Sequence, residues 1–135
     1  MAETLKLEMV TPYKRVLAEE VDEVTAPGFV GELGILPGHT PLLTTLKVGE
    51  LSYKRGKETF YVAVNWGYLD VEHDTVTVLV DTAEKADEID LARAKAALGR
   101  AEDALKMLPH DDKKYMIMEA ALQRALVRIR VAGER

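Results

Sequence analysis

The stretch Thr25–Leu46 restricts the fold of this chain more than any other. It reads TAPGFVGELGILPGHTPLLTTL and contains four glycines and three prolines among regularly spaced Val, Ile and Leu residues. Glycine permits φ > 0 and close backbone approach, whereas proline fixes φ and has no N–H to donate, so the apolar residues between them belong to short strands that turn sharply around a core. A structural loop is expected at Gly34, Pro37, Gly38 and His39. Neither GxxxxGK[ST] nor GxGxxG is present, so the glycines do not indicate a phosphate-binding loop.

The rest of the first 82 residues also has the alternation of strands. Apolar and polar residues alternate near the N-terminus and through 16–26, and two further strand pairs follow, namely 48–55 with Glu58–Val64 and Tyr68–Glu72 with Thr75–Asp81. Frequent turn signals without an intervening helix are typical of a β-sandwich or flattened barrel. We predict a sandwich of about ten short strands over residues 1–84.

The hydrophobic period changes to that of a helix at Asp87. Apolar residues recur at spacings of three and four along 91–108 and again along 115–129, and Pro109–Asp112 separates the two runs. Asp87 or Asp90 is a candidate N-cap for the first run. Residues 85–135 therefore predict an antiparallel two-helix hairpin, and the fold class is β + α, with the sandwich first.

The first predicted helix is rich in alanine, which buries little area per residue compared with leucine. An alanine-rich interface between strong helix formers suits a hairpin that exists both docked and released. The sequence leaves a permanently packed appendage open as the alternative.

Composition excludes several classes of function. The chain of 135 residues has no cysteine, and its three histidines, His39, His73 and His110, are far apart, so neither thiol chemistry nor a metal site is expected. No nucleophile–base pair or other catalytic group is expected either. The N-terminus lacks the pattern of a signal peptide and no apolar run is long enough to span a membrane, so the sequence predicts a cytosolic or peripheral protein without direct membrane insertion.

Charge is distributed unevenly along the chain. Residues 113–135 carry six basic and two acidic side chains, a net charge of +4, whereas the first 112 residues carry 12 basic and 21 acidic ones, a net charge of −9. The acidic body argues against nucleic acid as a partner, and the aromatic residues of its strands are expected to pack rather than to bind bases. The basic tail predicts contact with an acidic partner or an anion, with a solvated helix face as the alternative.

Two motifs extend this interpretation. The segment GELGILPGHTPLLTTLKVGEL in the first part and IDLARAKAALGRA at the start of the second closely resemble the epsilon subunit of bacterial and chloroplast F-type ATP synthases, and the likeness covers the whole chain. The resemblance implies a rotor subunit of the central stalk that is not itself catalytic. Its implied partners are the gamma, alpha and beta subunits and the membrane c-ring.

The resemblance also assigns a function to the hairpin. In that family a retracted hairpin folds on the sandwich, and an extended one lies along gamma and blocks ATP hydrolysis, held in part by basic side chains that meet an acidic segment of beta. The side chains in this chain that fit that role are Lys113, Lys114, Arg124, Arg128 and Arg130. The implied location is the cytoplasmic side of the bacterial plasma membrane, with the stromal side of the thylakoid membrane as the alternative.

Some members of the family bind ATP on the retracted hairpin through the pattern [I/L]-D-x-x-R-A and further arginines. The residues that match are Ile89, Asp90, Arg93, Ala94, Arg100, Arg124 and Arg128. No cofactor is required, and ATP would be a regulatory ligand. The physical alternative is that Asp90 caps a helix and that the arginines are solvated. For the chain as a whole, the alternative function is a free ligand-binding sandwich with a dimerising hairpin.

Overall fold

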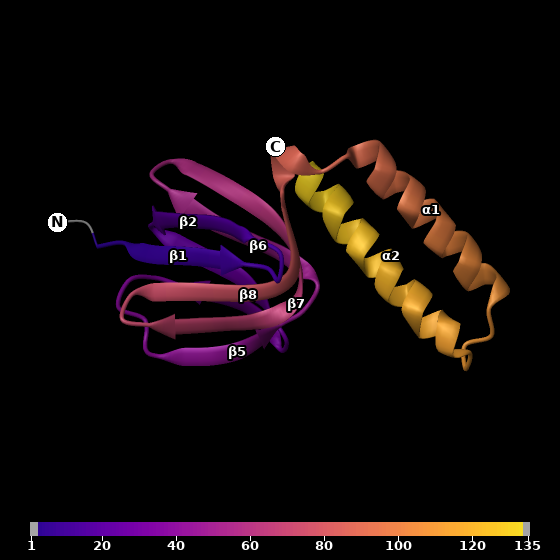
Figure 1. Ribbon diagram of the computed structural model, residues 1–135, viewed down its shortest axis with the longest axis horizontal. Helices are drawn as coiled ribbons and strands as arrows, with labels where there is room; N and C mark the ends of the chain where they lie inside the picture. The colour runs from indigo at the N-terminus through magenta and orange to yellow at the C-terminus, as the bar shows by residue number, and fades with distance from the viewer. Residues whose placement is uncertain (1–2, 134–135) are drawn as a thin grey trace.

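A computed structural model describes residues 3–133 as a strand-rich body followed by a pair of helices (Figure 1). The strands are β1 (Leu5–Val10), β2 (Arg15–Val21), β3 (Glu23–Gly28), β4 (Gly31–Ile35), β5 (Leu42–Leu46), β6 (Gly49–Arg55), β7 (Glu58–Glu72) and β8 (Thr75–Lys85). A short 3₁₀ turn η1 (Ala86–Glu88) leads into the helices α1 (Leu91–Met107) and α2 (Lys113–Ala132). The predicted order of a sandwich followed by a helical hairpin is confirmed.

The strands form one sheet that folds over into the two layers of a sandwich. Its order is β2-β1-β8-β7-β5-β3-β4, and β6 closes the fold by pairing with both β3 and β7. The pair β1 and β8 is parallel, whereas the other pairs are antiparallel. Alternate residues of each strand point inward, as the period of two predicts. The largest fully buried side chains are Leu5, Leu7, Met9, Ile35, Leu46, Leu51 and Leu69.

The described residues form eight strands rather than about ten, and one predicted break between strands is continuous strand. The separately predicted strands Glu58–Val64 and Tyr68–Glu72 left Asn65-Trp66-Gly67 as a break between them. Instead β7 bends there and continues, as its neighbouring strand changes from β6 to β5. Trp66 takes φ of 41° at the bend. A Cβ on Gly67 would lie 1.9 Å from the carbonyl oxygen of Leu79, so this glycine allows β7 and β8 to approach each other.

The glycine-rich stretch forms the second half of β3, then β4, β5 and the loop between these last two strands. Pro37, Gly38 and His39 lie in that loop as predicted, but Gly34 does not, because it pairs with Thr25 as part of β4. Gly38 has φ of 86°, a conformation that favours glycine, and its N–H donates to the Oδ1 atom of Asp74 at 2.7 Å. Asp74 and His73, both at positive φ, form the turn between β7 and β8. The loop is thereby fixed to the far end of a long strand pair.

The helical hairpin is attached to the sandwich mainly through α2. Asp90 caps α1, accepting from the N–H of Arg93 at 3.1 Å, and Asp112 caps α2, accepting from the N–H of Lys114 at 2.8 Å. The helices pack on each other, and α2 contacts β6, β7 and η1. Figure 1 shows α2 meeting the sandwich near its C-terminal end, with the rest of the hairpin extending away from the strands. The prediction took the alanine-rich first helix as the docking surface, but α1 packs mainly on α2, and α2 makes the attachment to the sandwich.

Candidate functional site

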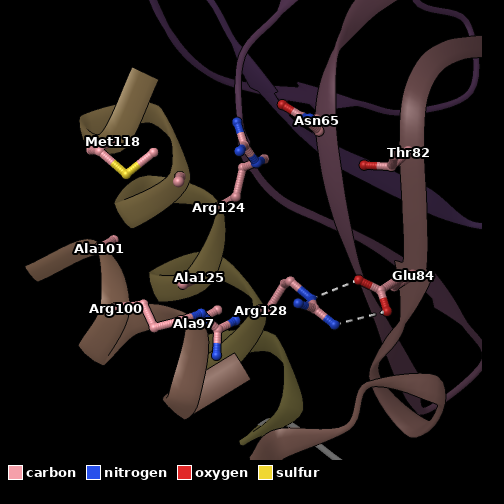
Figure 2. A pocket seen from close by; sticks show the side chains of 11 residues that line it. Asn65, Thr82, Glu84, Ala97, Arg100, Ala101, Met118, Arg124, Ala125 and Arg128 are labelled. Carbon is pink, nitrogen blue, oxygen red and sulfur yellow. Dashed lines mark hydrogen bonds and ion pairs between the residues drawn. The ribbon is translucent and has the colours of Figure 1, made fainter. Parts of the chain in front are cut away.

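A cleft of about 610 Å³ separates the hairpin from the sandwich (Figure 2). Its sandwich wall is polar and consists of Asn65 on β7 with Thr82 and Glu84 on β8. Its hairpin wall carries three arginines, Arg100 on α1 and Arg124 and Arg128 on α2, above an apolar surface formed by Ala97, Ala101, Met118, Ala121 and Ala125. Such a cleft offers guanidinium donors for anionic oxygens and an apolar surface for a flat ring.

One arginine of the cleft is held in place by the sandwich. The Nε atom of Arg128 lies at an ion-pair distance of 2.7 Å from Oε1 of Glu84, and Nη2 donates to Oε2 at 3.3 Å (Figure 2). The Nε–H group is not aligned to donate and has no hydrogen-bond partner among residues 3–133, so the pair has one hydrogen bond and one close ion contact. Arg124 also lines the cleft, and in Figure 2 its guanidinium points toward Asn65. The Oδ1 atom of Asn65 is buried without a hydrogen-bond partner among residues 3–133. The cleft therefore contains charged guanidinium groups and buried polar atoms that have no hydrogen-bond partner among the described residues.

Of the seven residues predicted to bind ATP, three line the cleft, namely Arg100, Arg124 and Arg128. Ile89 and Ala94 are buried at the base of the hairpin. Asp90 caps α1, which was the physical alternative for this residue, and the exposed Arg93 lies outside the lining of the cleft. The motif thus shapes the start of α1, and the arginines beyond it face the cleft.

Ile89 takes part in a small apolar cluster that joins the hairpin to the sandwich. Ala63 on β7 and Val131 and Ala132 on α2 are buried with it, and Tyr61, Ala86 and Val127 pack around them. Its few side chains bury far less apolar surface than the sandwich core does.

The residues predicted to meet an acidic partner occupy different positions along α2. Lys113 and Lys114 begin the helix and are exposed. Arg128 pairs with Glu84, and the Nε atom of Arg130 lies 3.0 Å from Oε2 of Glu50 on β6. Basic side chains near the C-terminal end of α2 therefore contact acidic side chains of the sandwich in this structure.

The sandwich wall of the cleft was not predicted from the sequence. Thr82 and Glu84 are two residues apart on β8, so both point to the same face of the sheet. That alternation was visible in the sequence, but which face the hairpin covers was not. Asn65 was assigned to a break between strands.

A second surface lies on the sandwich, beside the bend of β7. Trp66, Tyr68 and Leu79 are each about half exposed, and together with Thr11 and Pro12 they line a hollow of about 380 Å³. Large exposed apolar residues gathered in this way are typical of a protein–protein contact.

The pKa of Tyr53 is clearly perturbed. Burial, with a smaller contribution from the neighbouring Glu19 carboxylate, raises the pKa of Tyr53 to about 12. Its ring stacks on Phe60 with centroids 5.1 Å apart. The phenol is thus kept neutral as part of the packing between β6 and β7.

The described residues, 3–133, contain no group of three His, Asp or Glu side chains that could hold a metal ion. Within the same range neither helix is long and apolar enough to cross a membrane.

The fold is that of a two-part protein, in which a helical hairpin lies against a β-sandwich across an arginine-lined cleft. Residues 4–86 match the family model for the β-sandwich domain of the ATP synthase delta/epsilon chain, and residues 87–133 match the model for its long α-helix domain. The chain belongs to the ATP synthase delta/epsilon chain family.

Curated relatives cover nearly the whole chain. A protein of Geobacter metallireducens named ATP synthase epsilon chain is 66% identical over 134 residues, which is 99% of this chain and 97% of that protein. The protein of the same name from Geobacter sulfurreducens is 64% identical over the same shares of the two chains.

Solved structures share the fold at low identity. A chain in a structure of the Euglena gracilis mitochondrial ATP synthase matches with a TM-score of 0.82 and 22% identity, covering 98% of this chain and 82% of that one. A chain in the central stalk and c-ring structure of the Tetrahymena thermophila mitochondrial ATP synthase matches with a TM-score of 0.58 and 14% identity, covering 98% and 96%. These likenesses concern the fold alone.

Proposed function

We propose that the chain is the epsilon subunit of a bacterial F-type ATP synthase, a rotor subunit that couples the catalytic head to the membrane c-ring during ATP synthesis. The observation that carries this proposal is the identity of 64–66% with proteins named ATP synthase epsilon chain, over 99% of this chain. The subunit is not catalytic, and it lies peripherally on the cytoplasmic side of the plasma membrane.

The surfaces of the sandwich support binding to other subunits. The hollow beside Trp66 and Tyr68 gives an exposed apolar surface of the kind that binds a protein, and we assign it to gamma. The turn between β3 and β4 presents exposed Phe29 and Val30 at the edge of the sandwich, and we assign it to the c-ring. Both assignments leave the hairpin free to move.

The hairpin would inhibit ATP hydrolysis when it leaves the sandwich and extends along gamma. Its small apolar attachment through Ile89, Val131 and Ala132 supports a reversible contact. Lys113, Lys114, Arg124, Arg128 and Arg130 would then meet the acidic segment of beta. Alpha and beta are the other partners, and the extended hairpin would be the part that meets beta.

ATP is the proposed regulatory ligand of the retracted form. Arg100, Arg124 and Arg128 would bind its phosphates, and the alanines of the cleft would contact its base. Ile89, Asp90, Arg93 and Ala94 would support the site by fixing the start of α1. Bound ATP would shift the equilibrium toward the retracted form by the ratio of its affinities for the retracted and extended forms.

The test of the central proposal is reconstitution. The purified chain, added to a bacterial F-type ATPase depleted of its epsilon subunit, should bind the enzyme and lower its rate of ATP hydrolysis. A chain truncated after Ala86 is the matched control, because it should bind without inhibiting. Absence of binding by the full chain would favour the alternative, a free ligand-binding sandwich whose hairpin dimerises, and light scattering would then detect the dimer.

A further inference from the structure

We propose that Glu84 and Glu50 of the sandwich form an internal acidic docking site for the arginines of α2, and that this site competes with the external acidic partner for the same side chains. The inference rests on the proposed function for the identity of that partner. Its internal half rests on contacts in this structure.

The pair of Glu84 and Arg128 is the centre of this docking site. The carboxylate on β8 and the guanidinium on α2 meet at 2.7 Å and 3.3 Å, although 44 residues separate them in the chain. The side chain of Arg128 is only 24% exposed, so removing the carboxylate would leave a largely buried guanidinium without its counter-charge. The docked state therefore depends on Glu84 more than an exposed ion pair would suggest.

A second contact lies two residues further along α2. Arg130 meets Glu50 with Nε and Oε2 3.0 Å apart, and the Glu50 side chain is only 13% exposed. Arg130 itself is largely exposed, so this pair contributes less to docking than the first. Together the two contacts connect α2 to both β8 and β6.

The apolar part of the attachment is small, which makes the ion pairs decisive. The apolar cluster between the hairpin and the sandwich has only four buried side chains, namely Ala63, Ile89, Val131 and Ala132. A docked state held by so few apolar side chains responds to the loss of one charged contact.

The two uses of the arginines exclude each other. Arg128 cannot pair with Glu84 and also project from α2 toward a separate acidic surface, because the pair requires the C-terminal end of α2 to lie on the sandwich. An external acidic partner therefore releases the hairpin only if it binds these arginines with a more favourable free energy than the sandwich carboxylates do. Inhibition and docking are coupled through the same guanidinium groups.

The test measures docking and inhibition separately on the full chain. Because the chain has no cysteine, Lys57→Cys on the sandwich and Met107→Cys at the end of α1 give two unique labelling sites for energy transfer. Glu84→Gln should lower the docking equilibrium constant by about 3- to 10-fold, the range for a partly buried ion pair with one charge-assisted hydrogen bond. The same variant should inhibit an epsilon-depleted ATPase at proportionally lower concentration. Glu23→Gln, which removes a pair with Lys54 inside the sandwich, is the matched control and should match the unsubstituted chain in both assays.

Exchanging the two charges tests whether the sandwich and the external partner compete for Arg128, as distinct from the hairpin being merely less tightly docked. The double variant Glu84→Arg with Arg128→Glu should recover energy transfer, because the pair is restored with reversed polarity, but should inhibit poorly, because an acidic residue now faces the acidic partner. Energy transfer that is the same in Glu84→Gln and the control would overturn the internal docking site. Full inhibition by the charge-exchanged chain would overturn the competition. If the unsubstituted chain does not inhibit at all, the proposed inhibitory function is wrong, and the competition is wrong with it. The energy-transfer measurement still tests the internal docking site independently.

Discussion

Asp74 anchors Gly38 across the end of the sandwich through a hydrogen bond of 2.7 Å between its Oδ1 atom and the glycine N–H. The backbone carbonyl of the same residue accepts from the N–H of Lys6 at 2.8 Å. One turn residue thus joins the glycine-rich loop to strands from the beginning and the end of the domain. The loop has a structural role, as the sequence predicted.

Replacement of Gly38 tests that role. Gly38→Val should lower the free energy of unfolding by about 1 kcal/mol or more, because valine is strained at φ of 86°. Urea unfolding followed by circular dichroism measures the change. Gly34→Ala is the matched control and should cost less, since this glycine has no positive φ and an alanine methyl group there would meet open space. Equal losses in the two variants would contradict the assignment.

Truncation after Ala86 should leave a folded sandwich that still joins the enzyme. The main core lies within the strands, and the hairpin contributes only the small cluster around Ile89. Thermal unfolding of the shortened chain should remain cooperative, and co-purification with gamma measures assembly. An aggregated product, or one that no longer binds gamma, would show that the two parts are not independent.

The arginines of α2 should be needed for inhibition and not for assembly. Replacing Arg124, Arg128 and Arg130 together with alanine removes the charges that would meet the acidic segment of beta, so inhibition of hydrolysis should weaken. Added salt should reproduce part of the loss by screening. The ATPase assay at two ionic strengths measures both effects. Arg93→Ala, which removes an exposed arginine from α1 instead of α2, is the control. Undiminished inhibition by the triple variant would leave the basic face without this role.

ATP should bind the isolated chain in the cleft. Arg124→Ala should lower the affinity by ~10-fold, the loss expected for one charge-assisted contact, while leaving the pair of Glu84 and Arg128 intact. Arg93 lies outside the lining of the cleft and supports the start of α1 through its backbone N–H, which alanine keeps, so Arg93→Ala should lose little affinity. Calorimetric titration measures both. No heat at millimolar nucleotide would remove the sensor and leave the rotor assignment standing.

Alkaline pH should destabilise the sandwich through Tyr53. Its pKa is raised from 10.0 to about 12 on folding, so the contribution of the neutral phenol is complete below pH 10 and is lost as the pH rises through about 12. Tyr53→Phe has no phenol to ionise, so its thermal midpoint should fall less than that of the unsubstituted chain across this range. Melting curves recorded at several pH values test this, and parallel declines in both chains would contradict it.

Local patterns determined the elements of this protein. The alternation of apolar residues predicted the strands, and the change of period predicted both helices, because each pattern reports which side of an element meets the core. Asp90 was predicted among the candidate caps from its position alone, and it caps α1. These features depend on neighbours in the chain, so the sequence contains them directly.

The tertiary structure decided how the two parts meet. Glu84 and Arg128 are 44 residues apart, and nothing local indicates that they pair. The face of β8 that carries Thr82 and Glu84 became a wall of the cleft only because the hairpin lies opposite it. The continuation of β7 through Trp66 likewise depended on the exchange of its partner from β6 to β5. All of these features depend on which distant segments meet in the folded chain. The hairpin is docked by a small apolar cluster and a few ion pairs between such segments, and no periodicity in the sequence indicates them.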